Sequence, residues 1–172
     1  CDSVTGVLLA NSVNAINTSA MNTFMKIDSG QATAITCSVS TTGTCYYGYV
    51  AASSSSSLSL TNCYYNNVDG YDGVFLDDGA FAVISSCVFS RGRNAVHIGS
   101  TGIGTEIYIQ SCTFLEDNFT QNVISDTNTC VIVISSGVIR RDLISVPTGT
   151  NFNANFLDDS HDEYGGTIVL GE

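Results

Sequence analysis

Four segments of the chain repeat one pattern at a nearly constant interval. In each copy two apolar residues flank one position, a small residue follows three positions later, and an apolar or aromatic residue comes two positions after that. The second apolar position advances by 24, 25 and 25 residues. A fixed period indicates one stacked supersecondary unit, because each unit is too short to bury its own apolar face. The four copies are Leu58-x-Leu60-x-x-Cys63-x-Tyr65, Ala82-x-Ile84-x-x-Cys87-x-Phe89, Ile107-x-Ile109-x-x-Cys112-x-Phe114 and Ile132-x-Ile134-x-x-Gly137-x-Ile139.

Apolar residues alternate with mostly polar ones inside each copy, which is typical of a strand with one buried face. A second short apolar stretch follows in each period, as at Val74-Phe75-Leu76 and Ala95-Val96-His97-Ile98. A period of this length is too short for a propeller blade of ~40–45 residues or a helix pair of ~34. We therefore expect an all-β chain that forms a right-handed, single-stranded parallel β-helix of about six or seven rungs of 24–25 residues.

The four copies place Cys63, Cys87, Cys112 and Gly137 in one inward column. On these residues the chain resembles right-handed parallel β-helix proteins of the pectate-lyase-like superfamily, and its character is closest to the non-catalytic viral and surface members. The resemblance covers residues 58–139. It implies the fold, and it says little about function, because this fold hosts lyases, hydrolases, epimerases, adhesins and viral spikes.

We expect one β-helix domain over residues 1–172, since the chain is long enough for a single continuous core. Residues 58–139 hold the clear repeats, residues 1–57 form irregular N-terminal rungs, and residues 140–172 form a C-terminal loop and a last strand near Thr167–Leu170. The chain begins at Cys1 without a Met, so we expect a processed product or a fragment. No amphipathic segment suited to capping an open end is evident, which favours a neighbouring subunit or further sequence there.

Charged residues make up only 12% of the chain, and the net charge is −11. Nucleic-acid binding needs basic patches, so that function is excluded. No apolar run approaches the ~20 residues of a membrane span, so membrane insertion is not expected. We expect a location in a virion, outside the cell or at the cell surface.

Seven cysteines are present. We interpret Cys63, Cys87 and Cys112 as a reduced structural ladder, since Cys packs as a small hydrophobe in a core. Cys37 and Cys45 flank a short turn and form a hairpin disulfide or none; both alternatives stay open. Cys1 and Cys130 have no assignment, and zinc is disfavoured because no C-x-x-C motif is present. Asn17 and Asn118 begin glycosylation sequons.

Enzymes of the resembled fold carry clustered Asp residues with Arg, Lys or His beside them. The outward positions of the repeat carry no charged residue, so no general acid or base is evident there. Of the polygalacturonase-like pattern only Asp77-Asp78 is present. The alternative catalytic or glycan site joins two successive rungs. We expect no cofactor, with Ca²⁺ as the alternative at this site. In the other interpretation its carboxylates serve tight turns. Its members are Asp69, Asp72, Asp77, Asp78, Arg91, Arg93 and His97.

An outward stripe of apolar and aromatic residues indicates an interface. We expect contacts there with other protein subunits, in a homo- or hetero-oligomer, or with loops of the same chain. The leading hypothesis is a structural, non-enzymatic module of a virion capsid, spike, fibre or cell-surface array. The alternative is a carbohydrate-active enzyme or glycan-binding module. The stripe consists of Tyr64, Val83, Val88, Tyr108, Thr113, Val133 and Val138.

Overall fold

The computed structural model describes ten stretches of the chain, with gaps between them. These are residues 4–17, 21–41, 45–67, 71–99, 104–115, 119–126, 131–140, 144–145, 151–157 and 163–169. Within them, side chains are described in residues 7–16, 23–41, 46–66, 71–99, 104–115 and 119–121.

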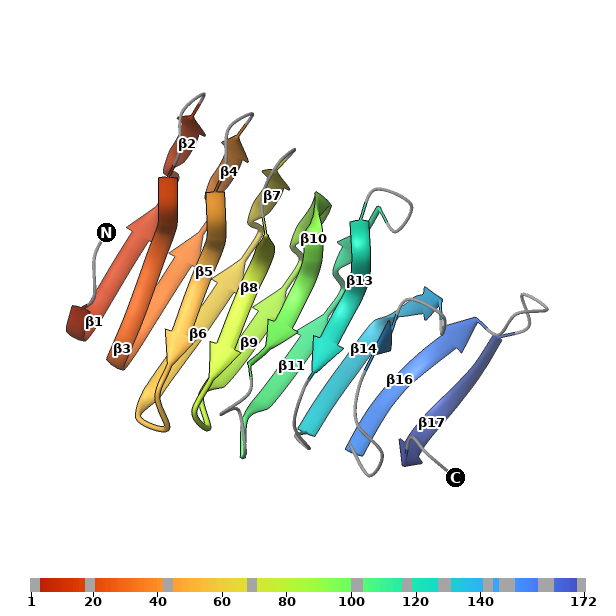
Figure 1. Cartoon of the computed structure of the whole chain (residues 1–172). Coiled ribbons are helices and arrows are strands. Elements are labelled where there is room, and N and C mark those ends of the chain that lie inside the picture. Colours follow the sequence, from red (N-terminus) through yellow and green to blue (C-terminus); the bar gives the residue numbers. More distant parts are fainter. Residues whose placement is uncertain are drawn as a thin grey trace.

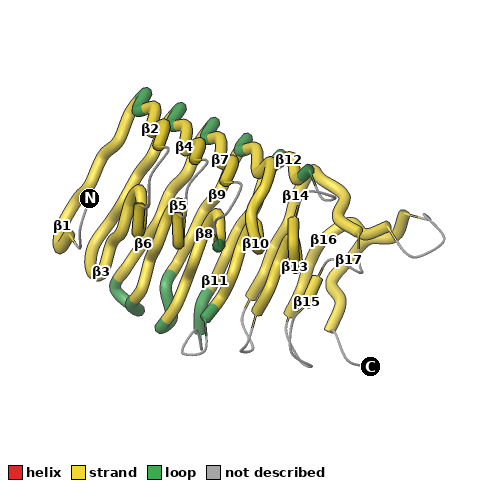
Figure 2. The backbone as a smooth tube through the Cα atoms, turned by 45° about the horizontal axis from the view of Figure 1, so that its top comes forward, coloured by secondary structure: helices red, strands yellow, loops and turns green. Residues whose placement is uncertain are grey.

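The described residues form seventeen strands and no helix (Figure 1). Strand length ranges from two residues in β12 and β15 to 15 in β3, and Figure 2 shows the strands following one another around the solenoid. Their bounds are β1 Val4–Asn11, β2 Asn14–Asn17, β3 Met21–Ile35, β4 Ser38–Thr41, β5 Cys45–Ala52, β6 Ser56–Thr61, β7 Tyr64–Asn67, β8 Asp72–Asp77, β9 Phe81–Ser85, β10 Val88–Ile98, β11 Glu106–Gln110, β12 Thr113–Phe114, β13 Phe119–Asp126, β14 Val131–Arg140, β15 Ile144–Ser145, β16 Asn151–Leu157 and β17 Glu163–Val169.

The strands stack in parallel on three faces of a solenoid, so the predicted all-β parallel β-helix is confirmed. Face 1 contains β1, the second half of β3, β6, β9, β11, β14 and β16. Face 2 contains β2, β4, β7, the start of β10, and β12. Face 3 contains the first half of β3, β5, β8, the rest of β10, β13 and β15.

The expected number of rungs needs correction. The structure is a solenoid of about 4 turns, where the sequence period predicted about six or seven rungs. Face 1 has more stacked strands than the solenoid has complete turns. Among the described strands, face 1 continues to β16, whereas face 2 ends at β12 and face 3 at β15. In the last described part, β17 pairs with β16 in antiparallel order, so this end closes with a hairpin. That strand covers the predicted last strand as far as Val169.

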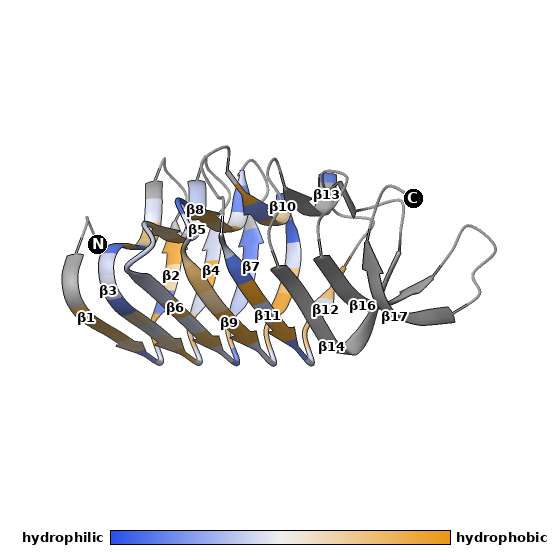
Figure 3. Cartoon of the chain, turned by 90° about the horizontal axis from the view of Figure 1, so that it is seen from below, coloured by the Kyte–Doolittle hydropathy of each residue, from blue (hydrophilic) through white to orange (hydrophobic). Residues whose placement is uncertain are grey.

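The register on face 1 matches the sequence period. Leu60 pairs with Ile84, Ile84 with Ile109, and Ile109 with Ile134. Leu60, Ile84 and Ile109 are buried, as are their neighbours two positions earlier. Hydrophobic residues recur in the strands of successive turns (Figure 3). The repeat therefore builds one continuous core between the three faces.

The register also extends further toward the N-terminus than the sequence pattern showed. Ala34 pairs with Leu60, and Ala10 pairs with Ala34. Cys37 is free, buried and three positions after Ala34, so it occupies the same slot as Cys63 and Cys87. Of the two alternatives left open for Cys37 and Cys45, the structure shows the one without a hairpin disulfide. Cys1 and Cys130 lie outside the described residues.

A left-handed residue joins face 1 to face 2 in successive turns. Ser12, Thr36, Asn62, Ser86 and Ser111 all have φ between 52° and 56°. Each lies one position before the inward residue that begins face 2. The Asn62 amide donates to the Ser85 carbonyl oxygen at 3.0 Å, and the Ser86 amide donates to that of Gln110 at 2.9 Å. The tight turn is thus tied to the next turn, which keeps the two faces in register.

The serine-rich tract between Ala52 and Leu58 forms an ordered turn between two rungs. Ser53 Oγ lies 2.9 Å from Ser56 Oγ, and Ser55 Oγ donates to Ser29 Oγ at 3.2 Å. Ser56 begins β6 and donates its hydroxyl to the Ile27 carbonyl oxygen at 3.3 Å. These hydroxyls satisfy polar groups that a larger side chain would leave unpaired.

Candidate functional site

The candidate polar cluster lies where β8 and β10 stack on face 3. Asp72 and Asn94 pair in register, and His97 pairs with Phe75 on the same two strands. Asp72 is 0% exposed. A carboxylate buried this completely needs hydrogen-bond donors on both of its oxygens.

Three side chains from the next turn supply those donors. Arg93 donates from Nε to Asp72 Oδ1 at 3.2 Å and from its terminal nitrogen to Oδ2 at 2.7 Å. Asn94 Nδ2 donates to Oδ1 at 2.7 Å. His97 Nδ1 lies 2.8 Å from Oδ2. The side chains of Arg93 and His97 remain 25% and 20% exposed, so both reach the surface of face 3.

The electrostatic balance favours an ionised Asp72. Burial alone would raise the pKa of this carboxyl, but hydrogen bonds from His97, Arg93 and Asn94 outweigh it, and the pKa lies below its usual value. A carboxylate that accepts four hydrogen bonds is held as an anion. It is also not free to take a proton from a substrate or to coordinate a cation.

Aromatic rings surround the exposed side of this cluster. Tyr46 stacks on Tyr71 with ring centroids 4.9 Å apart, and the Arg93 guanidinium lies 4.3 Å from the centroid of the Tyr71 ring. Phe75 packs edge-on against the His97 ring at 5.3 Å. Tyr47 lies 4.9 Å from Phe75 on its other side. Burial, followed by the charge of Asp72, raises the pKa of the Tyr47 hydroxyl.

Only part of the predicted site comes together. Asp72, Arg93 and His97 meet, and Asn94 joins them although the sequence analysis did not include it. Asp77 and Asp78 instead form the turn after β8, where Asp77 Oδ1 accepts the Asp78 amide at 3.1 Å. Asp78 has a φ of 52°. For these two residues the turn interpretation describes the geometry.

Two predicted site residues remain apart from the cluster. Arg91 is exposed on β10, where its backbone pairs with Asn66. Asp69 lies outside the described residues. No group of three or more His, Cys, Asp or Glu side chains suited to a metal ion occurs in the described part of the chain.

The cysteine column lines the inside of face 2. Cys63 Sγ donates to the Ala34 carbonyl oxygen at 3.4 Å, and the Cys63 amide donates to Cys87 Sγ at 3.4 Å. Hydrogen bonds with the thiols of Cys112 and Cys63, together with burial, raise the pKa of the Cys87 thiol. The four cysteines whose side chains are described, Cys37, Cys63, Cys87 and Cys112, are free. A neutral thiol in this position packs as a small hydrophobe.

The predicted outward stripe divides between two faces. Val83 pairs in register with Tyr108, and Tyr108 with Val133, on face 1. On face 2, Val88 pairs with both Tyr64 and Thr113. Tyr64 and Tyr108 are each a little over one-third exposed.

One stripe residue contacts a ring outside the stripe, and another does not lie where the sequence predicted. Phe81 packs beside Tyr108 with ring centroids 5.8 Å apart. Val138 pairs with Asn155 on β16 and not with the face 2 residues. The side chains of Val133 and Val138 lie outside the described set.

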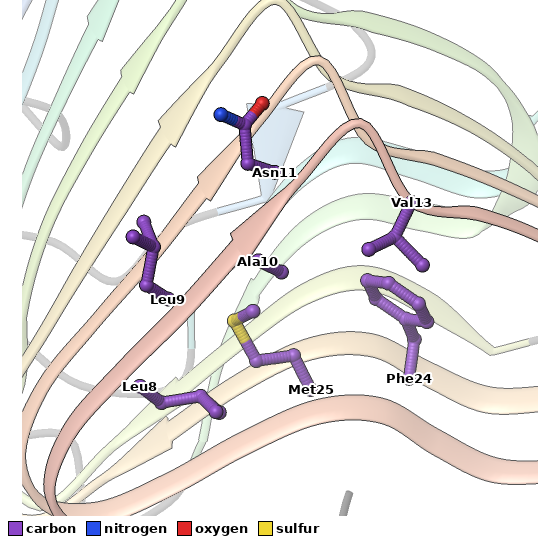
Figure 4. Close-up of a pocket in the computed structure, with 7 residues that line it drawn as sticks. All are labelled: Leu8, Leu9, Ala10, Asn11, Val13, Phe24 and Met25. Carbon is purple, nitrogen blue, oxygen red and sulfur yellow. The ribbon is translucent and has the colours of Figure 1, made fainter.

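A second apolar surface lies at the N-terminal end, and the sequence analysis missed it. Val7 is 80% exposed, Leu9 65% and Ile16 74%. Beside them is a cavity of about 380 Å³ (Figure 4). We call this surface, with the cavity, the N-terminal end surface. The cavity is lined by Leu8, Leu9, Ala10, Asn11, Val13, Phe24 and Met25.

No family model, no curated protein and no solved structure matches this chain. Among the residues that the structure describes, no helix is long and apolar enough to cross a membrane.

Proposed function

We propose that this chain is a structural, non-enzymatic β-solenoid module that makes protein–protein contacts in a larger assembly. The assembly is a virion capsid, spike or fibre, or an array at the cell surface. The observation that carries the proposal is the N-terminal end surface, where Val7, Leu9 and Ile16 are each about two-thirds exposed or more. Val7 and Leu9 lie on the same outward side of β1, and exposed apolar groups gathered in this way usually mark an interaction site.

The chemistry of the polar cluster supports the same proposal. The carboxylate that an enzyme would need, that of Asp72, is fully buried and fully bonded. Asp77 and Asp78 serve a turn. The resemblance to pectate-lyase-like proteins therefore points to the members that use the stacked ladder as a stiff scaffold.

The test is the molar mass of the protein in solution, measured by light scattering in reducing buffer across a range of protein concentrations. A stable oligomer or fibre supports a contact-forming module. A monomer at every concentration contradicts it, because the apolar side chains would then have no partner that this chain supplies.

A second candidate is a glycan-binding module, and the aromatic surface on face 3 favours it. Tyr46 is 42% exposed and lies over Tyr71, with the Arg93 and His97 side chains beside them. Exposed rings next to polar side chains suit the apolar faces and hydroxyls of sugars. Calorimetric titration with neutral and acidic oligosaccharides tests this candidate. Binding that Tyr46→Ala abolishes supports it, and no heat with any oligosaccharide in the panel contradicts it.

A further inference from the structure

The N-terminal end of the solenoid presents a free strand edge. β1 pairs with β3, and β2 pairs with β4; neither strand pairs on its other side among the described strands (Figure 1). On the side away from β3, alternate residues of β1 have backbone donors and acceptors that pair with no described strand. A free edge of this kind is a template for another strand.

Among the described residues, the core is only partly covered at this end. Leu8 and Ala10 pair with Ala32 and Ala34, which are buried, yet both remain partly exposed themselves. Phe24 is likewise only partly covered. The three side chains border the cavity (Figure 4). A partner that continues the stack would bury them in the way the following turns bury their equivalents.

Charge distinguishes the arrangements that two copies could adopt. Residues 3–25 contain no charged residue, and fourteen of the sixteen acidic residues follow residue 68. Two copies joined at their N-terminal ends keep these acidic portions far apart. A head-to-tail stack would instead place the neutral β1 edge against β17, which begins at Glu163 and follows Asp158, Asp159 and Asp162 in the sequence.

Strand direction also favours the head-to-head arrangement over the head-to-tail stack. The described C-terminal part ends in an antiparallel hairpin, so it does not offer the parallel edge that a continued stack would need. Two β1 strands related by a twofold axis pair in antiparallel order, and one surface then serves both copies.

We propose that the partner of the N-terminal end surface is a second copy of this chain, bound head to head through antiparallel β1 strands. The register centres on Leu8, which places Val7 of each copy opposite Leu9 of the other. This proposal rests on the proposed function, because it names the partner of that contact surface. The two cavities then face each other, and the two half-finished cores become one.

The experiment compares three variants by sedimentation velocity, with circular dichroism to verify folding. Leu9→Asp and Val7→Lys each place a charge opposite an apolar residue, and we expect each to raise the dimer dissociation constant by about 100-fold. Thr33→Asp is the matched control, because Thr33 pairs with Leu9 one turn further into the solenoid on the same face. It should leave the dimer unchanged.

Mixing the two end variants tests the register itself. In an antiparallel pair centred on Leu8, Lys at position 7 of one copy faces Asp at position 9 of the other. An equimolar mixture of Val7→Lys and Leu9→Asp should therefore form a heterodimer, while each variant alone stays monomeric.

Each other outcome has a defined meaning. Loss of the dimer in Val7→Lys and in Leu9→Asp, with the dimer kept in Thr33→Asp and restored in the mixture, supports the head-to-head pair. An oligomer that survives Leu9→Asp but is lost in Tyr108→Ser overturns the head-to-head pair and leaves the proposed function standing. Open-ended growth beyond a dimer also overturns only the head-to-head pair. A wild-type monomer at all concentrations overturns both.

Discussion

Replacing Asp72 by Asn tests how strongly the polar cluster joins two turns of the solenoid. The substitution keeps the shape of the side chain and removes the charge that Arg93 and His97 contact at 2.7 and 2.8 Å. It also sets a donor where a hydrogen-bond acceptor is needed. We expect the free energy of unfolding to fall, because two cationic or donor groups then lose their partner.

The magnitude follows from burial. Breaking a fully buried ion pair costs about 3–5 kcal/mol. Arg93 and His97 are 25% and 20% exposed and can regain water after the substitution. Arg93 also keeps its contact with the Tyr71 ring. We therefore expect a loss of about 2–3 kcal/mol, at or below the lower limit of that range.

Urea unfolding at neutral pH measures this loss, with Asp78→Asn as the matched control. Asp78 is exposed at φ 52°, a conformation that Asn also tolerates, so the control should change stability by less than about 0.5 kcal/mol. A loss below about 1 kcal/mol for Asp72→Asn would refute the reasoning, because it would mean that the carboxylate contributes no more than one ordinary hydrogen bond.

The same pair of proteins predicts a pH dependence. The pKa of Asp72 lies below its ordinary value of 3.8 in the folded state. A lowered pKa in the folded state stabilises the fold fully above the ordinary value, and this contribution is lost as the pH falls through the folded-state pKa. The stability gap between the wild type and Asp72→Asn should therefore be constant above about pH 5 and should shrink in more acidic solution.

Three further predictions concern packing, the turns and assembly. Gly73→Ala should lower the free energy of unfolding in urea by about 1–3 kcal/mol, because an added Cβ would lie 2.7 Å from the Ala95 carbonyl oxygen and 2.8 Å from the Phe89 ring. Gly92→Ala is the comparison: its added Cβ would lie 3.2 Å from the nearest atom, so the loss should be smaller. Thr36→Asn should raise the melting temperature and increase the free energy of unfolding by about 1 kcal/mol, because Thr36 is β-branched at φ 52° and Asn adopts this conformation more readily. An unchanged or lower melting temperature would contradict backbone strain at this position. The dimer dissociation constant should change less than about tenfold as salt is raised, because the acidic portions lie beyond a screening length of ~10 Å; a marked strengthening by salt would indicate side-by-side packing instead.

The sequence predicted the repeat well where the inward residues are large. Leu60, Ile84 and Ile109 stand out from their polar neighbours, and their spacing matches the observed register. The preceding turn places Ala32 and Ala34 in those positions, and alanine contrasts little with serine and threonine. The repeat there escaped notice for that physical reason.

The left-handed residue explains why the sequence pattern left the position of Cys37 open. Ile35, Cys37 and Val39 alternate in the sequence and resemble one strand. Thr36 has a φ of 52°, so the chain turns between Ile35 and Cys37 and the alternation does not continue across it. Ile35 ends β3 on face 1 and is only half-buried, whereas Cys37 and Val39 face the core from face 2.

The candidate site was predictable in part from the period. Arg93 and His97 follow Asp72 by 21 and 25 residues, which is about one turn. Asn94 follows it by 22 and could have been found by the same reasoning. The sequence could not show that Asp72 is buried while Asp77 and Asp78 form a turn, because all three lie in the same short segment of a single period.

The stacking of parallel strands also explains where this chain can carry charge. Equivalent residues in successive turns lie ~4.8 Å apart, so a charged residue repeated at one position would be repelled by the like charge in the next turn. Hydroxyl pairs such as Thr61 and Ser85, 3.3 Å apart, avoid this repulsion. Asp72 is buried only because the next turn offers Arg93 and His97. Most of the remaining acidic residues lie toward the C-terminal portion. The uncharged residues 3–25 are therefore the place where contact between two copies meets the least electrostatic repulsion.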